Sequence, residues 1–191
     1  MSGKRGKLIV ISGPSGCGKG TVIKKLAETT PFWLSVSDTT REIRAGETAG
    51  VNYNYLSNDE FMSKVNDGLM LEHASYSGRA GKITYYGTPK PPVLSRLEAG
   101  ENVLLEIEVQ GASQIKKALP EAVLIFIMPP SMEELEARLR GRGTEKPEDI
   151  KTRLETAKTE IALADSFDYT VVNDEVETCA ERIKKIIEGD I

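Results

Sequence analysis

The sequence is poor in the residue types that several functions require. Its 191 residues include one histidine, His73, and two cysteines, Cys17 and Cys179. One imidazole cannot build a multi-histidine metal centre. The cysteines show neither CxxC nor Cys/His ligand spacing, which argues against a zinc module and a disulfide scaffold. This cysteine usage is typical of the reducing cytoplasm, and we expect the protein to be cytoplasmic.

Long hydrophobic runs and excess positive charge are also lacking. The longest apolar run, Ala122–Met128, is much shorter than the ~20 residues that span a bilayer, and the N-terminus has no signal-peptide pattern. Lysine and arginine number 25 against 29 acidic residues, for a net charge of −4. The chain therefore lacks the positive field that non-specific nucleic-acid binders use. We expect no membrane, nucleic-acid or obligate protein partner.

The composition is that of a folded domain. Hydrophobic residues make up 39% and charged residues 28%, which is too apolar for a disordered chain. A length near 200 residues suits one compact domain with inserted lobes. We therefore predict a single domain over residues 1–191.

Short apolar runs separated by helical patterns predict the fold class. Four runs indicate buried strands, and they cover residues 7–12, 102–107, 122–128 and 169–172. None of them alternates polar with apolar residues, which is typical of strands covered on both faces. The prediction is an α/β fold with a parallel sheet core between helices.

One interval interrupts this pattern. Residues from about 34 to 92 are rich in Tyr, Ser, Thr and Gly, with one convincing helix near Asp59–Val65. Ser57 and Glu60 offer that helix a capping box. We interpret the interval as a small mixed α/β lobe inserted into a core made of residues 5–33, 93–137 and 165–191.

A glycine-rich loop between a strand and a helix carries the strongest chemical signal. The string GPSGCGKGT fits the P-loop pattern GxxxxGK, in which backbone N–H groups and a helix N-terminus hold phosphates. The predicted ATP-binding residues are Gly13, Pro14, Ser15, Gly16, Cys17, Gly18, Lys19, Gly20 and Thr21. Gly20 replaces the usual hydroxyl residue, so Thr21 becomes the candidate Mg²⁺ ligand. A glycine-rich turn without a ligand is the disfavoured alternative.

Cys17 is predicted to fill a variable loop position without chemistry. A helix N-terminus can lower a thiol pKa, so an oxidation-sensitive Cys17 is the alternative hypothesis.

A second candidate phosphate site lies in the inserted lobe. Arg41 and Arg44 are three residues apart near Glu47, and Tyr53 follows. Two planar guanidinium groups can neutralise a phosphate monoester, with tyrosine hydroxyls as further donors. Taken alone, however, two solvated arginines on a loop would be the better interpretation.

The whole string from Ser35 to Tyr55 resembles the signature of the guanylate kinase family, SxSxTTRxxRxGExxGxxYxF/Y. The resemblance extends to the GPSGxGKGT loop, Tyr86-Gly87-Thr88, the RLxxRGT string from Arg138 and Val171–Asp174. It implies the P-loop kinase fold, with residues 138–164 as a helical lid. It also implies transfer of a phosphoryl group from ATP to GMP, with dGMP as a further acceptor and Mg²⁺ as cofactor.

Roles of single residues follow from the same resemblance. GMP-binding residues would be Ser37, Arg41, Arg44, Glu47, Tyr53, Glu72, Tyr86, Gly87, Thr88, Glu106 and Glu108. Catalytic residues would be Lys19, Arg41, Arg138, Arg142 and Arg153, while Asn173 would lie beside the adenine. The chemistry of Glu72 agrees, because one carboxylate can accept the N1–H and N2–H₂ donors of guanine together, whereas adenine presents an acceptor at N1.

Two other functions stay open at this point. One is a non-catalytic guanylate-kinase-like module that binds phosphopeptides at Arg41 and Arg44. The other is a related P-loop kinase with a different acceptor. Retention of Lys19 and the lid arginines disfavours the module, and Glu72 with Ser37 and Thr88 disfavours another acceptor.

Overall fold

The computed structural model describes residues 5–77, 83–141 and 147–190. The chain forms two compact units. The first contains Met1–Leu8, Trp33–Leu105 and Gln110–Ala122, and the second contains Ile9–Phe32, Glu106–Val109 and Val123–Ile191.

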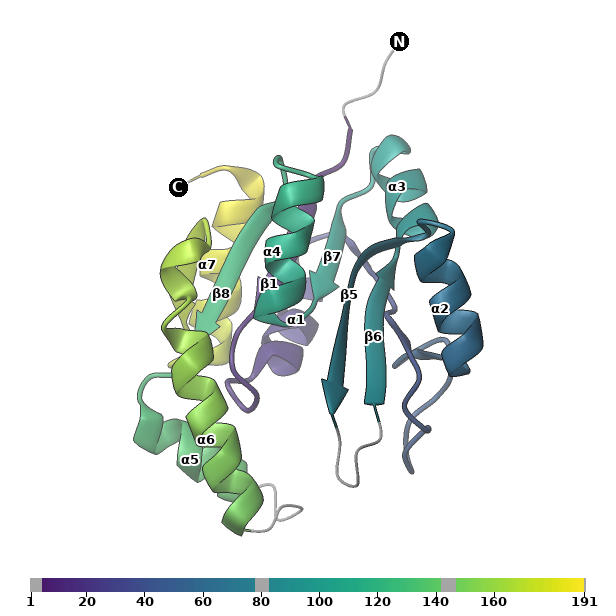
Figure 1. Cartoon of the computed structure of the whole chain (residues 1–191). Helices are drawn as coiled ribbons and strands as arrows, with labels where there is room; N and C mark the ends of the chain where they lie inside the picture. Colours follow the sequence, from purple (N-terminus) through teal and green to yellow (C-terminus); the bar gives the residue numbers. More distant parts are fainter. Residues whose placement is uncertain (1–4, 78–82, 142–146, 191) are drawn as a thin grey trace. The chain divides into compact units, whose positions relative to one another are not determined.

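Three neighbouring parallel strands lie in the described part of the second unit, and Figure 1 labels two of them, β1 and β8. They are β1 (Leu8–Ser12), β8 (Val123–Met128) and β9 (Tyr169–Val172). β8 pairs with both neighbours, with Ile9 opposite Val123 and Ile125 opposite Tyr169. Every residue of β1 is buried, as the continuous apolar run predicts for a strand covered on both faces.

The α-helices described in the second unit are α1 (Lys19–Ala27), α5 (Met132–Gly141), α6 (Pro147–Ile161) and α7 (Val176–Glu188). A short 3₁₀ helix covers Ala164–Ser166. α7 packs against α1, and its buried residues include Cys179, Ile183 and Ile187. α5 and α6 share a cluster that includes Leu135, Leu139, Ile150 and Ala157.

The first unit contains a mixed four-stranded sheet with the order β4-β3-β6-β5. Its strands are β3 (Asp38–Thr39), β4 (Asn54–Tyr55), β5 (Met70–Ser77) and β6 (Ile83–Pro89). β3 runs parallel to β4, and β6 runs antiparallel to both β3 and β5. The register of β5 against β6 shifts between Met70 and Glu72.

The predicted lobe helix is α2 (Asn58–Asn66). Ser57 caps it, and the reciprocal bond from the Glu60 side chain completes the capping box. Phe61 is fully buried and stacks on Tyr85 with ring centroids 5.5 Å apart. The aromatic contact fixes α2 against β6.

The rest of the first unit contains the predicted strand at residues 102–107, together with a short strand at Trp33–Leu34 and a helix at Lys90–Glu98 that the sequence did not reveal. β2 (Trp33–Leu34) pairs parallel with β7 (Val103–Glu106). α3 (Lys90–Glu98) begins with two prolines in its first turn, and α4 (Val109–Ala118) follows β7. β2 is too short to show a pattern. The Lys90-Pro91-Pro92 string is typical of a loop. Proline is nevertheless tolerated in the first turn of a helix, where the backbone N–H groups have no intrahelical acceptor.

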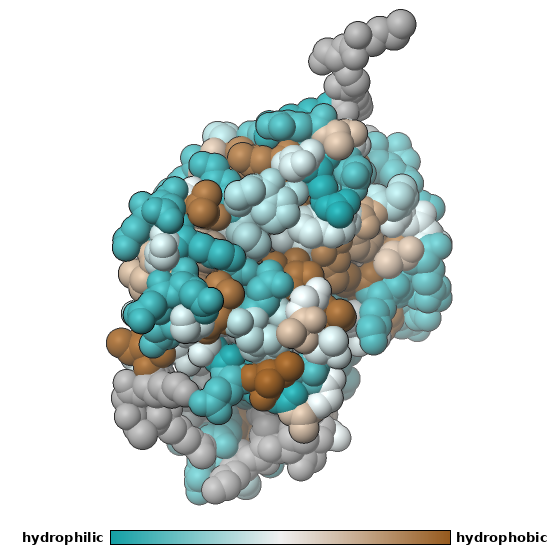
Figure 2. Space-filling model, turned by 90° about the vertical axis from the view of Figure 1, so that its right-hand side faces the viewer, coloured by the Kyte–Doolittle hydropathy of each residue, from teal (hydrophilic) through white to brown (hydrophobic). Residues whose placement is uncertain are grey.

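The α/β prediction is confirmed, and all four predicted core strands are present. The molecular face drawn in Figure 2 is mostly hydrophilic, with separate hydrophobic patches. Within the described ranges, no helix combines the length and apolar character needed to cross a membrane.

Candidate functional site

The glycine-rich loop joins β1 to the start of α1, as predicted. Gly13, Gly16 and Gly18 all have positive φ, at 145°, 94° and 96°. A Cβ on Gly18 would lie 2.4 Å from the Asn173 amide nitrogen, so glycine is required there both by conformation and by space. The loop therefore presents its backbone at the N-terminus of α1, where a phosphate is favoured.

Lys19 folds back over this loop. Its ammonium group donates to the carbonyl oxygens of Gly13 at 2.5 Å and Pro14 at 3.2 Å. These contacts hold the cation at the loop that it is predicted to serve. Gly20 and Thr21 are exposed on the first turn of α1. An exposed Thr21 is accessible to a cation, which its predicted role as a Mg²⁺ ligand requires.

Cys17 differs from a reactive thiol. The side chain is fully buried, and burial raises the pKa of the Cys17 thiol despite the nearby Lys19 ammonium, which lowers it. A raised pKa disfavours the thiolate, the form that reacts with oxidants. The structure thus supports the interpretation of Cys17 as a packing residue.

The carbonyl of Cys17 is a meeting point for two predicted site residues. Asn173 donates to it from its side-chain amide at 2.7 Å, and Arg138 donates at 3.3 Å. Arg138 also donates to the Asn173 carbonyl at 3.2 Å and to Glu134 at 3.0 Å. α5 and the segment after β9 are therefore both hydrogen-bonded to the P-loop.

Arg153 contacts the same loop from α6. Its guanidinium donates to the Ser15 hydroxyl at 2.7 Å. Arg140 instead pairs with Glu136 on the solvated face of α5. Arg142 lies outside the described residues. The structure thus brings Arg138 and Arg153 to the P-loop.

Carboxylates also lie near Lys19 in the second unit. Burial raises the pKa of Glu160, the negative charge of Glu108 raises it further, and Lys19 lowers it. Glu106 and Glu160 both act electrostatically on the Cys17 thiol. Sequence reasoning missed Glu160. The feature that could have indicated it is a carboxylate beside the apolar residues of α6.

In the first unit, Glu47 organises the predicted phosphate site. Its two oxygens accept from both terminal nitrogens of Arg41, at 2.8 and 2.9 Å, and one oxygen also accepts from the Arg44 backbone N–H at 2.8 Å. The pairing with Arg41, followed by the Arg44 bond, lowers the pKa of Glu47 to about 2. Arg44 keeps its side chain exposed. Glu47 thus links the side chain of Arg41 to the backbone of Arg44.

Tyrosines surround Arg41. Its guanidinium lies 5.3 Å from the ring centroid of Tyr53 and 5.8 Å from that of Tyr55. Tyr53 makes edge contacts with Tyr55 and Tyr86, and Tyr76 makes one with Tyr86. The Tyr55 hydroxyl also donates to Glu47 at 2.8 Å. Sequence reasoning used Tyr55 as the end of a signature and missed this contact.

The predicted base-reading residues meet on neighbouring strands. Glu72 on β5 is 6% exposed and Thr88 on β6 is fully buried, and the Thr88 hydroxyl donates to Glu72 at 2.7 Å. Gly87 leaves the space for a close approach, since a Cβ there would lie 2.9 Å from the Glu72 carbonyl oxygen. Ser37 is half-buried directly before β3.

Asp38 is a buried charge that sequence reasoning also missed. The Asn54 amide donates to one carboxylate oxygen at 2.8 Å, and the Lys64 ammonium donates to the other at 2.7 Å. These bonds tie β3 to β4 and α2. The feature of the sequence that could have indicated Asp38 is its position next to Ser37 in the signature.

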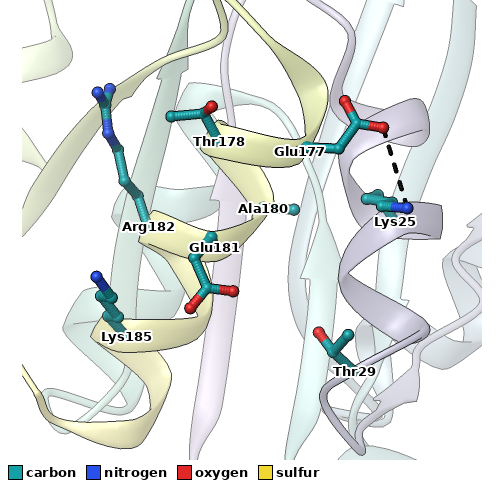
Figure 3. A pocket seen from close by; sticks show the side chains of 8 residues that line it. All are labelled: Lys25, Thr29, Glu177, Thr178, Ala180, Glu181, Arg182 and Lys185. Atoms are coloured by element: carbon teal, nitrogen blue, oxygen red, sulfur yellow. Dashed lines mark ion pairs between the residues drawn. The ribbon is translucent and has the colours of Figure 1, made fainter.

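A surface hollow of about 520 Å³ lies between α1 and α7, apart from all predicted site residues (Figure 3). It is lined by Lys25, Thr29, Glu177, Thr178, Ala180, Glu181, Arg182 and Lys185. Lys25 is paired within it with Glu177 at 3.9 Å. The charges of its lining are mixed in sign, which does not indicate a ligand class.

An α/β fold whose P-loop is contacted by arginines of two helices defines the class of P-loop phosphotransferases. A model of the family described as guanylate kinase matches residues 5–190. The chain belongs to the guanylate kinase family.

Individual relatives agree over nearly the full length. A guanylate kinase of Lactococcus lactis subsp. lactis is 52% identical over 188 residues, covering 98% of this chain and 89% of the relative. One of Clostridium acetobutylicum is 49% identical, covering 96% and 86%. The crystal structure of a guanylate kinase from Anaplasma phagocytophilum matches with a TM-score of 0.79 and 35% identity, covering 100% of this chain and 88% of that one.

Proposed function

We propose that this enzyme transfers the γ-phosphoryl group of ATP to the phosphate of GMP, giving ADP and GDP. The observation that carries the proposal is the buried pair of Glu72 and Thr88 in a chain that also has the GxxxxGK loop of a P-loop. The P-loop accounts for a nucleotide donor. The pair accounts for guanine, because a carboxylate accepts two donors and a hydroxyl can serve O6.

The ATP side follows from the second unit. The loop from Gly13 to Thr21 would hold the polyphosphate through backbone N–H groups, with Lys19 turning from its own carbonyls to the outer phosphates. Asn173 would lie beside the adenine. Arg138 and Arg153, already bonded to the loop, would neutralise charge on the transferring group, and Arg142 would join them.

The GMP side follows from the first unit. Arg41, held by Glu47, and the exposed Arg44 would bind the phosphate together with the hydroxyls of Tyr53 and Tyr86. Ser37, Glu72, Gly87 and Thr88 would surround the base, while Glu106 and Glu108 would face the acceptor or the metal. Because the Glu47 carboxylate holds Arg41, the guanidinium is already oriented before the substrate binds, which reduces the entropy lost on binding.

The chemical step needs alignment and positive charge rather than a protein nucleophile. An oxygen of the GMP phosphate forms a bond to the γ-phosphorus while the bond from that phosphorus to the bridging oxygen of ADP breaks. ADP leaves with the electron pair of that bond. We propose that residues 34–92 act as the GMP lobe and residues 138–164 as a lid, which together exclude water as a competing acceptor.

Mg²⁺ suits the residues present. Among the described residues, no group of three or more His, Cys, Asp or Glu side chains could hold a metal ion. Mg²⁺ bound through nucleotide phosphates and water needs only one or two protein oxygens. Thr21 would supply one, and Glu106 or Glu108 a second through water. When bound, the ion would neutralise phosphate charge.

We propose that the enzyme acts in the cytoplasm on free nucleotides and accepts dGMP as well as GMP. Both cysteines are free and buried, as suits a reducing compartment.

An ADP-release assay with GMP, dGMP, AMP, CMP and UMP tests the proposal. Turnover with GMP far above AMP, CMP and UMP is expected. Absence of turnover with every acceptor would support the phosphopeptide module, and preference for AMP would refute the base-site assignment. Omission of Mg²⁺ should abolish turnover, and turnover that persisted in excess EDTA would refute the metal assignment.

A further inference from the structure

One side chain outside the predicted site is bonded to the strand that carries Glu72. Gln114 on α4 accepts a hydrogen bond from the His73 backbone N–H at 3.2 Å and donates one to the His73 carbonyl at 2.9 Å. A primary amide that pairs with both backbone groups of one residue imitates a neighbouring strand. β5 is an edge strand of the mixed sheet, so Gln114 occupies its free edge at this residue.

The geometry of the β5–β6 ladder explains why this edge matters for Glu72. His73 lies opposite Gly87, and both of its backbone groups turn away from β6 towards Gln114. The His73 N–H belongs to the peptide plane that follows the Cα of Glu72. Fixing that plane fixes the direction in which the Glu72 side chain leaves the strand.

A second observation points to the same residue. The β5–β6 register shifts between Met70 and Glu72, since Met70 lies opposite Pro89 while Glu72 lies opposite Thr88. An irregularity of this kind re-aims side chains and locally disrupts the ladder. Glu72 therefore lies between the register shift, which precedes it in the strand, and His73, which Gln114 contacts. A strand in this situation can slip unless it is held from its other edge.

We propose that Gln114 is a positioning residue for guanine recognition: by bonding to His73 it holds Glu72 where both N1–H and N2–H₂ of guanine can reach it. The proposal rests on the proposed function. Gln114 contacts no substrate in this account. It acts on the choice of base through Glu72.

The test compares GMP with IMP, which lacks the N2 amino group. Gln114→Met keeps the length of the side chain and removes both hydrogen bonds. Its GMP:IMP ratio of kcat/KM should fall about fivefold, as expected for one net hydrogen bond. The KM for ATP should stay unchanged. Gln114→Glu, which keeps the acceptor but sets a carboxylate against the His73 carbonyl, should lower the ratio at least as much.

Lys117→Met is the matched control, because Lys117 is exposed on the same helix and receives the same new side chain. It should keep the wild-type ratio. A merely structural role of Gln114 would lower the melting temperature and leave the GMP:IMP ratio unchanged, and that result would overturn the inference. If the wild-type enzyme itself failed to prefer GMP over IMP, the proposed function would fail instead.

Discussion

At the scale of single residues, Glu72 is the side chain that we propose determines base choice. It is buried, and its carboxylate accepts a hydrogen bond from the Thr88 hydroxyl. A polar site of this kind rejects a mismatched base because buried groups are left unpaired. In the proposed function, Glu72 sets the specificity for the acceptor and the P-loop binds the donor.

Glu72→Gln should lower kcat/KM for GMP by about 100-fold, since the new amide N–H₂ would face a guanine donor. The KM for ATP should not change. Initial rates at varied GMP and ATP measure both quantities. Glu98→Gln, an exposed carboxylate of the same unit, serves as control, and an unchanged KM for GMP in Glu72→Gln would contradict the assignment.

Glu47 gives a prediction in pH. Its pKa of about 2 lies below its ordinary range because of Arg41, the Arg44 backbone and Tyr55, so the folded state is favoured by this pairing above the unfolded pKa of about 4.3. The contribution is lost as pH falls from about 4.3 towards 2. Tyr55→Phe removes one donor and should raise the pKa of Glu47.

Carboxyl-detected NMR titration of both proteins measures that shift. The wild-type Glu47 signal should titrate near pH 2, and the Tyr55→Phe signal should titrate at higher pH. An identical midpoint in the two proteins would show that the Tyr55 hydroxyl does not stabilise the carboxylate.

Cys17 should resist alkylation at neutral pH. Burial raises the pKa of the thiol and also hides the sulfur, so little thiolate forms or reacts. Iodoacetamide treatment followed by mass spectrometry and an activity assay should find Cys17 unmodified and the rate intact. Rapid modification that ATP prevents would instead establish a reactive thiol in the loop.

At the scale of elements, the buried charge of Asp38 ties three elements of the first unit together. β3, β4 and α2 meet through its bonds to Asn54 and Lys64. The Asp38 side chain is fully buried while that of Lys64 is 36% exposed. Removing the lysine leaves a buried carboxylate with a weaker set of partners.

Lys64→Met should therefore lower the free energy of unfolding by about 1–3 kcal/mol, less than for a fully buried pair because water reaches the lysine. Urea unfolding followed by circular dichroism measures the change. The same substitution at exposed Lys117 should have little effect. Asp38→Asn combined with Lys64→Met should cost less than the sum of the single changes, and strict additivity would contradict the ion pair.

The sequence predicted some helices and strands better than others. β1, β8 and α7 are long enough to show period and burial in their own residues, and the capping box identified α2. β3 and β4 have two residues each, and their conformation depends on partners distant in the chain. The contact of Gln114 with His73 spans 41 residues, so no local pattern could reveal it.

At the scale of the whole molecule, the two half-sites were predicted to different depths. The P-loop is a contiguous string whose function lies in its own backbone, so Gly13–Thr21 could be located from spacing alone. The predicted GMP site gathers residues from the loops next to β3 and β4 and from strands β5 and β6. Arg41, Glu47 and Glu72 were therefore found through the family resemblance, while Tyr55 and Asp38 emerged only from folded contacts.

The net charge of −4 does not show where the positive residues of the predicted site lie. The predicted site assigns Lys19, Arg41, Arg44, Arg138, Arg142 and Arg153 to two bound phosphate esters. Positive charge concentrated where phosphates bind, in a chain acidic on average, favours small anionic substrates over extended polyanions.

The most direct test of the central claim is the initial rate of ADP release with ATP, Mg²⁺ and each of GMP, AMP, CMP and UMP. The account predicts that kcat/KM for GMP exceeds that for AMP by about 10⁴ or more, as polar pairing at a buried base site allows. Comparable rates with GMP and AMP, or no turnover with GMP, would contradict it.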